Sequence, residues 1–366
     1  MKYTIMSFAF AGLFSTLLLA APLGLPPVPV PADNPITPEK VALGDKLFND
    51  TRFSTTGDVS CATCHKTEAA FTDSPLRVSE GIRKLTGTRN APTVVNAAYF
   101  KLLFWDGREP DLEGQAGQPF LNPVEMGLPN HDPILEVVRN DRQYKRMFRA
   151  AFGVSGNSIT MKEVLQAIAS FERTVISADT RFDKYQFGGD KTALTAAEIR
   201  GLDVFINQGR CVSCHTINQT YALFTDNKFH NLNVGFDRIR KDVKELADAF
   251  SQAKSQGTDV DIAVLTNRNT SELGRFAVTD QWTDMGSFKT STLRNIEMTA
   301  PYMHDGSLET LEDVVDFYNN GGRVEEDDPI NDFQSGGIRR LNLSETQKQD
   351  LVTFMKALTS PQHASK

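Results

Sequence analysis

Two short motifs of the same design contain all four cysteines of the chain. They are Cys61-Ala62-Thr63-Cys64-His65 and Cys211-Val212-Ser213-Cys214-His215. In each motif the paired cysteines can form thioether bonds with the vinyl groups of a haem, and the histidine that follows can bind its iron. The motifs therefore predict two covalently attached c-type haems, with His65 and His215 as iron ligands.

Zinc binding and short-range disulfides are the other uses of closely spaced cysteines. A zinc ribbon places its second cysteine pair roughly 15 to 20 residues after the first, whereas Cys211 follows Cys61 by 150 residues. Disulfide-stapled exported folds seldom place a histidine after each pair. The doubled pattern favours haem attachment over both.

The composition is that of an ordinary globular protein, and the N-terminal segment predicts export. The chain has 366 residues, 40% hydrophobic and 23% charged, and a net charge of −7. Residues 1–21 resemble a signal peptide, because Lys2 precedes an apolar run that ends in small residues, and residues 22–36 form a Pro-rich spacer. We expect a periplasmic protein, with an uncleaved, membrane-tethered or cell-surface form as the alternative. The acidic balance argues against nucleic acid as a partner.

The sequence around each cysteine motif repeats. Gly44-Asp45-Lys46-Leu47-Phe48 precedes the first motif and Gly201-Leu202-Asp203-Val204-Phe205 the second, each after a helix-start signal at Thr37 or Thr195. Each half also ends in a capped amphipathic helix, beginning near Thr160 and Ser344.

This repeat predicts a mainly α-helical fold. We expect two cytochrome c-like domains with long connecting loops, residues 37–185 and residues 186–366. Residues 237–275 are interpreted as an insertion in the second half, with one amphipathic helix.

Five further segments occur in the order found in one family. They are Arg89-Asn90-Ala91-Pro92-Thr93, Phe104-Trp105-Asp106-Gly107-Arg108, Leu112-Glu113-Gly114-Gln115-Ala116, Asn122-Pro123-Val124-Glu125-Met126 and Thr299-Ala300-Pro301-Tyr302. Together with the cysteine motifs they resemble the bacterial di-haem cytochrome c peroxidase and MauG family over nearly all the chain after the leader.

The resemblance implies a peroxide site at the first haem. Peroxide cleavage needs a base that moves a proton between the two oxygens and a polar group that steadies the departing water. The residues matching the family's distal pair are Glu125 and Gln115, and Pro119 matches a proline that packs near them. Trp105 matches the tryptophan between the haems, where it can carry electrons.

One departure from the common peroxidases concerns the first haem. Those enzymes close it with a histidine until reduction releases that ligand. Here no histidine occurs between His65 and His131, and Ser79-Glu80-Gly81 stands where the ligand would fall. We therefore expect the first haem to be open without activation, as in MauG.

The second haem needs a sixth ligand. In the family the calcium-binding Thr and Pro precede that ligand by 19 and 17 positions, and these counts from Thr299 and Pro301 reach Tyr318. MauG has a tyrosine there, whereas most peroxidases have a methionine. Tyr318 also shares a helical face with apolar residues and could simply be packed. Met303, Met298 and His230 stay possible ligands.

The resemblance also implies a calcium ion between the domains. Its ligands would be Asn90 and the carbonyls of Thr299 and Pro301, with water completing the shell. We expect His304 to have a structural or haem-edge role.

Three functions remain in view. The leading hypothesis is a periplasmic di-haem peroxidase that takes electrons from a small cytochrome c or copper protein. The second is a MauG-like enzyme that uses peroxide to oxidise tryptophans of a partner protein, which Tyr318 favours. Against it, MauG has a tryptophan two residues before the second motif, where this chain has Gly209. The third is a non-catalytic di-haem electron carrier, and a homodimer is possible in each case.

Overall fold

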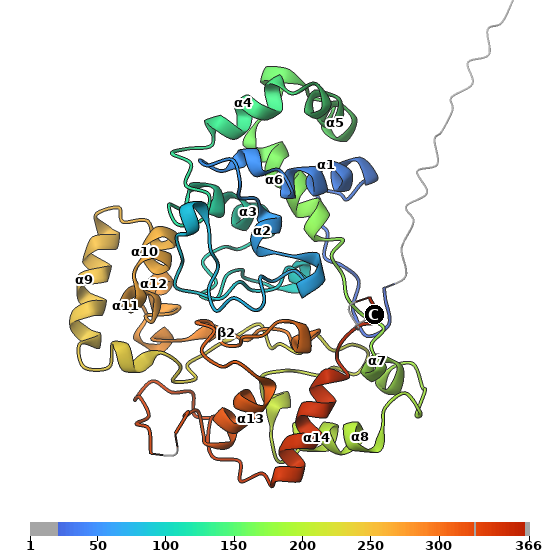
Figure 1. Ribbon diagram of the computed structural model, residues 1–366, viewed down its shortest axis with the longest axis vertical. Coiled ribbons are helices and arrows are strands. Elements are labelled where there is room, and N and C mark those ends of the chain that lie inside the picture. The colour runs from blue at the N-terminus through green and yellow to red at the C-terminus, as the bar shows by residue number, and fades with distance from the viewer. Residues whose placement is uncertain (1–20, 326, 363–366) are drawn as a thin grey trace, which may run out of the picture.

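The computed structural model describes residues 21–325 and 327–362 and is mainly helical (Figure 1). The predicted signal peptide lies almost wholly outside these residues. Among the described residues the strands are β1 (Phe229–His230) and β2 (Phe288–Lys289), which pair antiparallel. No helix in the described ranges has the length and apolar character needed to cross a membrane. The expected helical fold class is confirmed at this level.

The helices divide into three groups along the chain. The first group is α1 (Pro38–Phe48), α2 (Cys61–Cys64), α3 (Leu112–Leu121), α4 (Asp132–Asn140), α5 (Arg142–Phe152) and α6 (Met161–Glu172). The second is α7 (Arg181–Gln186), α8 (Ala196–Ile206), α13 (Leu311–Asn319) and α14 (Glu345–Lys356). The third is α9 (Val243–Ser255), α10 (Val260–Thr266), α11 (Arg268–Ser271) and α12 (Phe276–Thr279).

Each group surrounds its own hydrophobic cluster. The first is built by α1 and α3–α6 around buried residues such as Phe120 and Phe148. The second is built by α7, α8, α13 and α14 around Phe205 and Phe354. The third lies within α9–α12, which form a lobe at the side of the molecule in Figure 1. Burial of these apolar side chains is the main force that holds each group together.

The glycine of the repeat, Gly44 or Gly201, allows close helix packing in both halves. α1 packs on α6, and a Cβ atom at Gly44 would lie 1.9 Å from the carbonyl oxygen of Ala167. α8 packs on α14, and a Cβ at Gly201 would lie 2.0 Å from the carbonyl oxygen of Asp350. Glycine therefore lets the helix before each cysteine motif cross the closing helix at backbone contact, which explains why this position recurs in the repeat.

The Pro-rich segment is folded against the body rather than extended from it. Leu25 is buried, and the Asn34 side chain donates to Glu113 Oε1 over 2.7 Å and to the Gln166 carbonyl over 2.9 Å. Arg294 donates to the Gly24 carbonyl and forms a two-pronged ion pair with Asp183 of α7, at 2.8 Å for each contact. The segment predicted as a spacer thus joins the two halves.

Candidate functional site

A cavity of about 150 Å³ lies beside the first cysteine motif. Its wall includes Cys61, Cys64 and His65, and it also includes Gln115, Pro119, Glu125 and Trp105. The fold thus brings the four predicted catalytic residues to one cavity with the first motif. Among the described residues of that wall, His65 is the single histidine.

The His65 ring is oriented by the backbone. Its Nδ1–H donates to the Phe71 carbonyl oxygen over 3.0 Å, which leaves Nε2 free to bind a metal. Burial lowers the pKa of the imidazole, so the ring is neutral at physiological pH, as a ligand must be.

The loop that carries Glu125 is held by a second loop. Ile82 N–H donates to the Glu125 carbonyl over 2.8 Å. A Cβ at Gly81 would lie 2.1 Å from the Val124 carbonyl oxygen, so only glycine allows this approach. Gly81 and Ile82 therefore position the loop of Glu125.

Helix α3 supplies two more of the four predicted catalytic residues, Gln115 and Pro119. The Asp111 side chain caps α3 by accepting from Gly114 N–H, and Gln115 follows in the first turn. Pro119 lies inside the helix, and its carbonyl accepts from Met126 N–H over 3.2 Å. This contact ties the end of α3 to the loop of Glu125.

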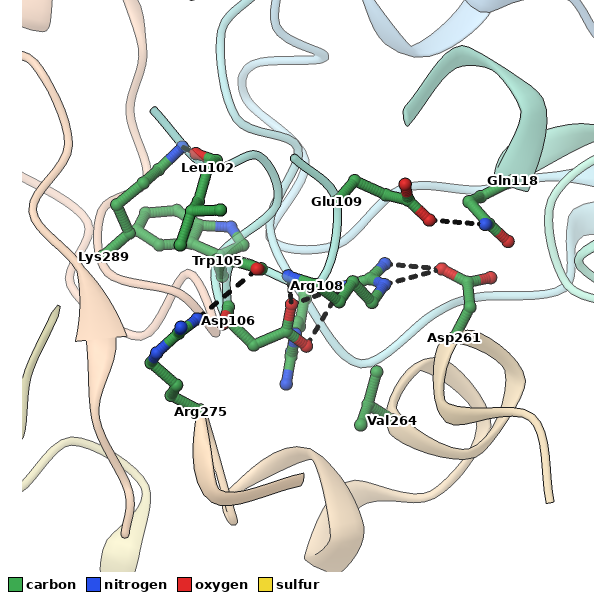
Figure 2. Close-up of polar contacts among 12 residues, drawn as sticks. Leu102, Trp105, Asp106, Arg108, Glu109, Gln118, Asp261, Val264, Arg275 and Lys289 are labelled. Atoms are coloured by element: carbon green, nitrogen blue, oxygen red, sulfur yellow. Dashed lines mark hydrogen bonds and ion pairs between the residues drawn. The ribbon is translucent and has the colours of Figure 1, made fainter. Parts of the chain in front are cut away.

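A chain of buried charges joins Asp106, Arg108 and Asp261 (Figure 2). Arg108 donates from Nη1 to Asp106 over 2.9 Å and from Nη2 to Asp261 of α10 over 2.6 Å. Arg89 donates to the other oxygen of Asp106 over 2.6 Å. Burial alone would raise the pKa of Asp106, but the Arg108 and Arg89 guanidiniums outweigh it and hold the pKa at about 2.

Glu125 is in the opposite electrostatic situation. Its Oε2 is buried and lacks a hydrogen-bond partner among the described residues. Burial, followed by repulsion from Asp261, raises its pKa to about 8, against an opposing effect of Arg108. A carboxyl group with a pKa near neutrality can both accept and donate a proton, as acid–base catalysis requires.

Trp105 lies in the wall of this cavity and also in that of a second one. Its indole Nε1–H donates to the Asn90 carbonyl over 2.8 Å, and its own carbonyl accepts from Lys289 N–H over 2.7 Å. Asn90 and Lys289 likewise line both cavities. The indole is therefore held between the two cavities from both halves of the chain.

The second cavity, of about 520 Å³, lies beside the second cysteine motif. Its wall includes Cys211, Cys214 and His215, and the His215 Nδ1–H donates to the Phe224 carbonyl over 2.9 Å. This hydrogen bond repeats the one between His65 Nδ1 and the Phe71 carbonyl. Both motifs therefore place their histidines in the same way.

Several predicted sixth-ligand candidates face the second cavity. Tyr318 of α13, Met303 and His230 line it, whereas Met298 is outside the described wall. Burial raises the pKa of the Tyr318 hydroxyl above its usual value. His230 Nε2 is bonded to Asp226 over 2.9 Å, so that nitrogen is already engaged. Tyr318 and Met303 remain open as ligands.

The predicted calcium residues also gather at the second cavity. Asn90, Thr299 and Pro301 all line it, and Asn90 N–H donates to the His304 carbonyl over 2.8 Å. The Asn90 side-chain amide donates to the carbonyl of Arg77 over 3.2 Å. His304 stacks on Phe288, with 3.6 Å between ring centres, and bonds Glu272 over 2.9 Å. His304 thus has partners of a structural kind at the cavity edge.

The residues present fit two haem c groups. All four cysteines are free of disulfides and lie at the cavity walls, and each adjacent histidine is oriented by a hydrogen bond from its Nδ1 to a backbone carbonyl. The first cavity also holds unpartnered carboxyl oxygens from Glu125 and Glu172, a polar arrangement that an apolar structural core would not retain.

Sequence reasoning missed three residues of these walls or their supports. They are Asp261, Glu172 and Lys289. Lys289 and Asp261 lie in segments without a motif, and Asp261 comes from the part of the chain interpreted as an insertion. Glu172 ends the closing helix predicted from Thr160, but no motif marks it as a wall residue.

Comparisons with known proteins agree with this geometry. Residues 38–192 match the family model described as di-haem cytochrome c peroxidase. The chain is 36% identical to cytochrome-c peroxidase IdrP1 of Denitromonas iodatirespirans over 92% of this chain and 86% of that protein. It is 35% identical to methylamine utilization protein MauG of Methylorubrum extorquens, over 90% of this chain and 81% of that protein.

Solved structures give the same result. A crystal structure of a MauG-like protein associated with microbial copper homeostasis superposes with a TM-score of 0.75 at 33% identity, covering 94% of this chain and 97% of that one. The di-haem peroxidase BthA of Burkholderia thailandensis superposes with a TM-score of 0.69 at 25% identity, covering 90% and 88%. The chain is thus an oxidoreductase acting on peroxide, and it belongs to the di-haem cytochrome c peroxidase and MauG family.

Proposed function

We propose that the chain is an exported di-haem peroxidase that reduces hydrogen peroxide at the first cavity with electrons relayed from the second. The observation that carries this proposal is the shared cavity of His65, Glu125 and Gln115, with a buried carboxyl group and no second histidine among its described wall residues. Reduction of one peroxide to two waters consumes two electrons and two protons, which the site must deliver separately.

The protein residues divide the work as follows. Bound at His65 and His215, the haems would supply iron that binds peroxide in the first cavity and stores electrons in the second. Glu125 accepts a proton from one peroxide oxygen and returns it to the departing one, which leaves as water. The Gln115 amide donates a hydrogen bond to that oxygen. Pro119 lies on the same cavity wall.

Trp105 provides the connection between the cavities. The hydrogen bond from its Nε1 to Asn90 fixes the plane of the indole, and a fixed ring can pass electrons without rearrangement. The electrons come one at a time from a small cytochrome c or copper protein that docks near the second cavity. Export to the periplasm fits this partner, and calcium at Asn90, Thr299 and Pro301 would hold the halves in register.

A MauG-like activity on a partner protein is the second candidate. Tyr318 in the wall of the second cavity favours it, since a phenolate ligand would stabilise ferric iron and high oxidation states. Gly209 opposes it, because a Cβ there would lie 2.8 Å from the Val204 carbonyl oxygen and a tryptophan would not fit without a backbone shift. A hopping route like that of MauG is thus absent at this position.

Stopped-flow spectroscopy of the ferric protein mixed with peroxide tests the proposal. We expect a rapid spectral change that Glu125→Gln slows by ~10²–10⁴-fold, while Glu68→Gln, on the exposed surface, reacts as the wild type. No rapid change in the wild type would indicate an electron carrier. Turnover with a reduced small cytochrome c separates the two enzymes, because only the peroxidase would oxidise it steadily.

A further inference from the structure

Lys289 of β2 is a buried lysine in an unusual place. It is 8% exposed, and its side chain lines the walls of both cavities. Figure 2 shows the side chain running beside Trp105 toward Leu102. Lysine is rarely buried to this extent without an acidic partner.

The Lys289 ammonium group has too few hydrogen-bond acceptors and no paired negative charge. Nζ donates to the Leu102 carbonyl over 3.1 Å and lies 4.0 Å from the centre of the Phe100 ring. Lys289 forms no ion pair with a carboxylate of the described residues, and the charge of Asp106 is already paired with Arg89 and Arg108. An ammonium group carries three donors, and one carbonyl satisfies only one of them.

The other cationic groups of the first cavity are committed elsewhere. Arg89 donates to Asp106 and Ser271, and Arg108 to Asp106 and Asp261. Burial lowers the pKa of Lys289 to about 7, with Asp106 opposing that shift. A lysine held here gains most from an anion that enters with a ligand of the cavities.

A haem brings such anions. Its two propionate carboxylates lie on the edge of the macrocycle away from the vinyl groups that the cysteines would bind. We propose that Lys289 is a shared anchor for propionate groups of both haems, and that its positive charge raises the reduction potentials of both. The inference rests on haem binding in the two cavities and not on peroxide chemistry.

A purely structural role is the competing account. The backbone N–H of Lys289 already ties β2 to the Trp105 carbonyl, and that bond survives any change of side chain. If the ammonium group served only to bond Leu102, its removal would leave at least one of the two haems unaffected. The two accounts therefore differ in how many haems respond.

The test is a spectroelectrochemical titration of both haems in Lys289→Met without peroxide. Loss of a nearby positive charge destabilises the reduced state of each haem. We therefore expect the equilibrium constant for reduction of each haem to fall about tenfold, which lowers each reduction potential by ~59 mV for one electron. Lys289→Arg should keep both potentials near the wild-type values. Lys244→Met removes an exposed charge and should change neither.

Haem content and circular dichroism establish that each variant is folded. If Lys289→Met does not yield the two-haem protein, Lys289→Gln takes its place and must show the same double shift. A shift at one haem only, or at none, in a folded variant overturns the proposal. Failure of the wild type to carry two haems would instead count against the proposed function.

Discussion

At the residue scale, the site depends on keeping one carboxyl group unpaired among many that are paired. Asp106 and Asp261 both bind Arg108, while the buried Oε2 of Glu125 has no hydrogen-bond partner in the described structure. Burial acts on both Asp106 and Glu125, but Asp106 has guanidinium partners that lower its pKa to about 2, whereas the pKa of Glu125 is raised to about 8. The proton of Glu125 can therefore move near neutral pH, while Asp106 stays ionised.

This difference predicts a pH dependence. Because the pKa of Glu125 is raised to about 8, its basic form is scarce at neutral pH and accumulates as the pH rises. The rate of the first reaction with peroxide should therefore increase through a midpoint near pH 8. Stopped-flow measurements between pH 6 and about 9.5 check this, and a rate that falls over the range would contradict the role of Glu125 as a base.

Asp261→Asn provides the matched variant for that profile. Removing its charge takes away the repulsion that helps raise the pKa of Glu125, so the midpoint should move to lower pH. Asp259→Asn, on the exposed start of the same helix, should leave the midpoint unchanged. An unchanged profile in Asp261→Asn would show that burial alone sets the pKa.

The sequence predicted Glu125 and Gln115 because their motifs are local. It could not predict Arg108 as a bridge, since its partner Asp261 lies in a different half and in a helix without a motif. Contacts between distant segments depend on how whole elements pack, which no local pattern records. Lys289 escaped notice for the same reason.

At the scale of elements, the repeated glycines let the helix before each cysteine motif pack closely against the closing helix of its half. The capping residues Thr37, Thr160, Thr195 and Ser344 each precede a helix as their patterns predicted. The repeat pattern does not explain why glycine occurs in each half. The reason is the contact with a partner helix more than a hundred positions away, which only the fold reveals.

Alanine at these glycines should weaken both helix pairs. Gly44→Ala and Gly201→Ala place a methyl group at 1.9 Å and 2.0 Å from backbone oxygens, so we expect each to lower the free energy of unfolding by about 1–3 kcal/mol or more. Gly117→Ala in α3 is the control, because its nearest contact would be 3.5 Å from a side chain. Denaturant titration measures the free energy of unfolding of all three variants. If Gly117→Ala lowered it as much as the other two, the close helix crossing would not explain the need for glycine.

The ion pair between α7 and the loop before α13 should be a second point of sensitivity. Asp183 and Arg294 are fully buried and joined by two hydrogen bonds. Asp183→Asn leaves the Arg294 charge buried without compensation, so we expect a loss of ~3–5 kcal/mol. Asp248→Asn, which breaks the exposed pair with Lys244, should cost under ~1 kcal/mol. Similar losses in both variants would show that burial does not govern this pair.

At the scale of the molecule, the two cavities share a wall built by both halves. Asn90, Trp105 and Lys289 all belong to that wall, and the lobe of α9–α12 reaches from the second half to the first through Asp261. The predicted repeat accounts for the two similar halves. The two halves are held together by the buried ion pairs and the packed Pro-rich segment. The sequence pattern predicted neither of these contacts.

This arrangement predicts that the two haem irons differ in coordination. The first cavity offers His65 and, among its described wall residues, no second histidine or methionine other than Met126, which is buried in the first hydrophobic cluster. The second offers His215 together with Tyr318 and Met303. One iron should therefore keep an open coordination position while the other is closed.

Electron paramagnetic resonance of the fully oxidised protein tests this claim most directly. We predict one high-spin ferric signal from the His65 haem and one low-spin signal without methionine character from the His215 haem. Tyr318→Phe should change only the low-spin signal. Two low-spin signals in the wild type would show that both irons are closed, and would contradict the account of an open peroxide site.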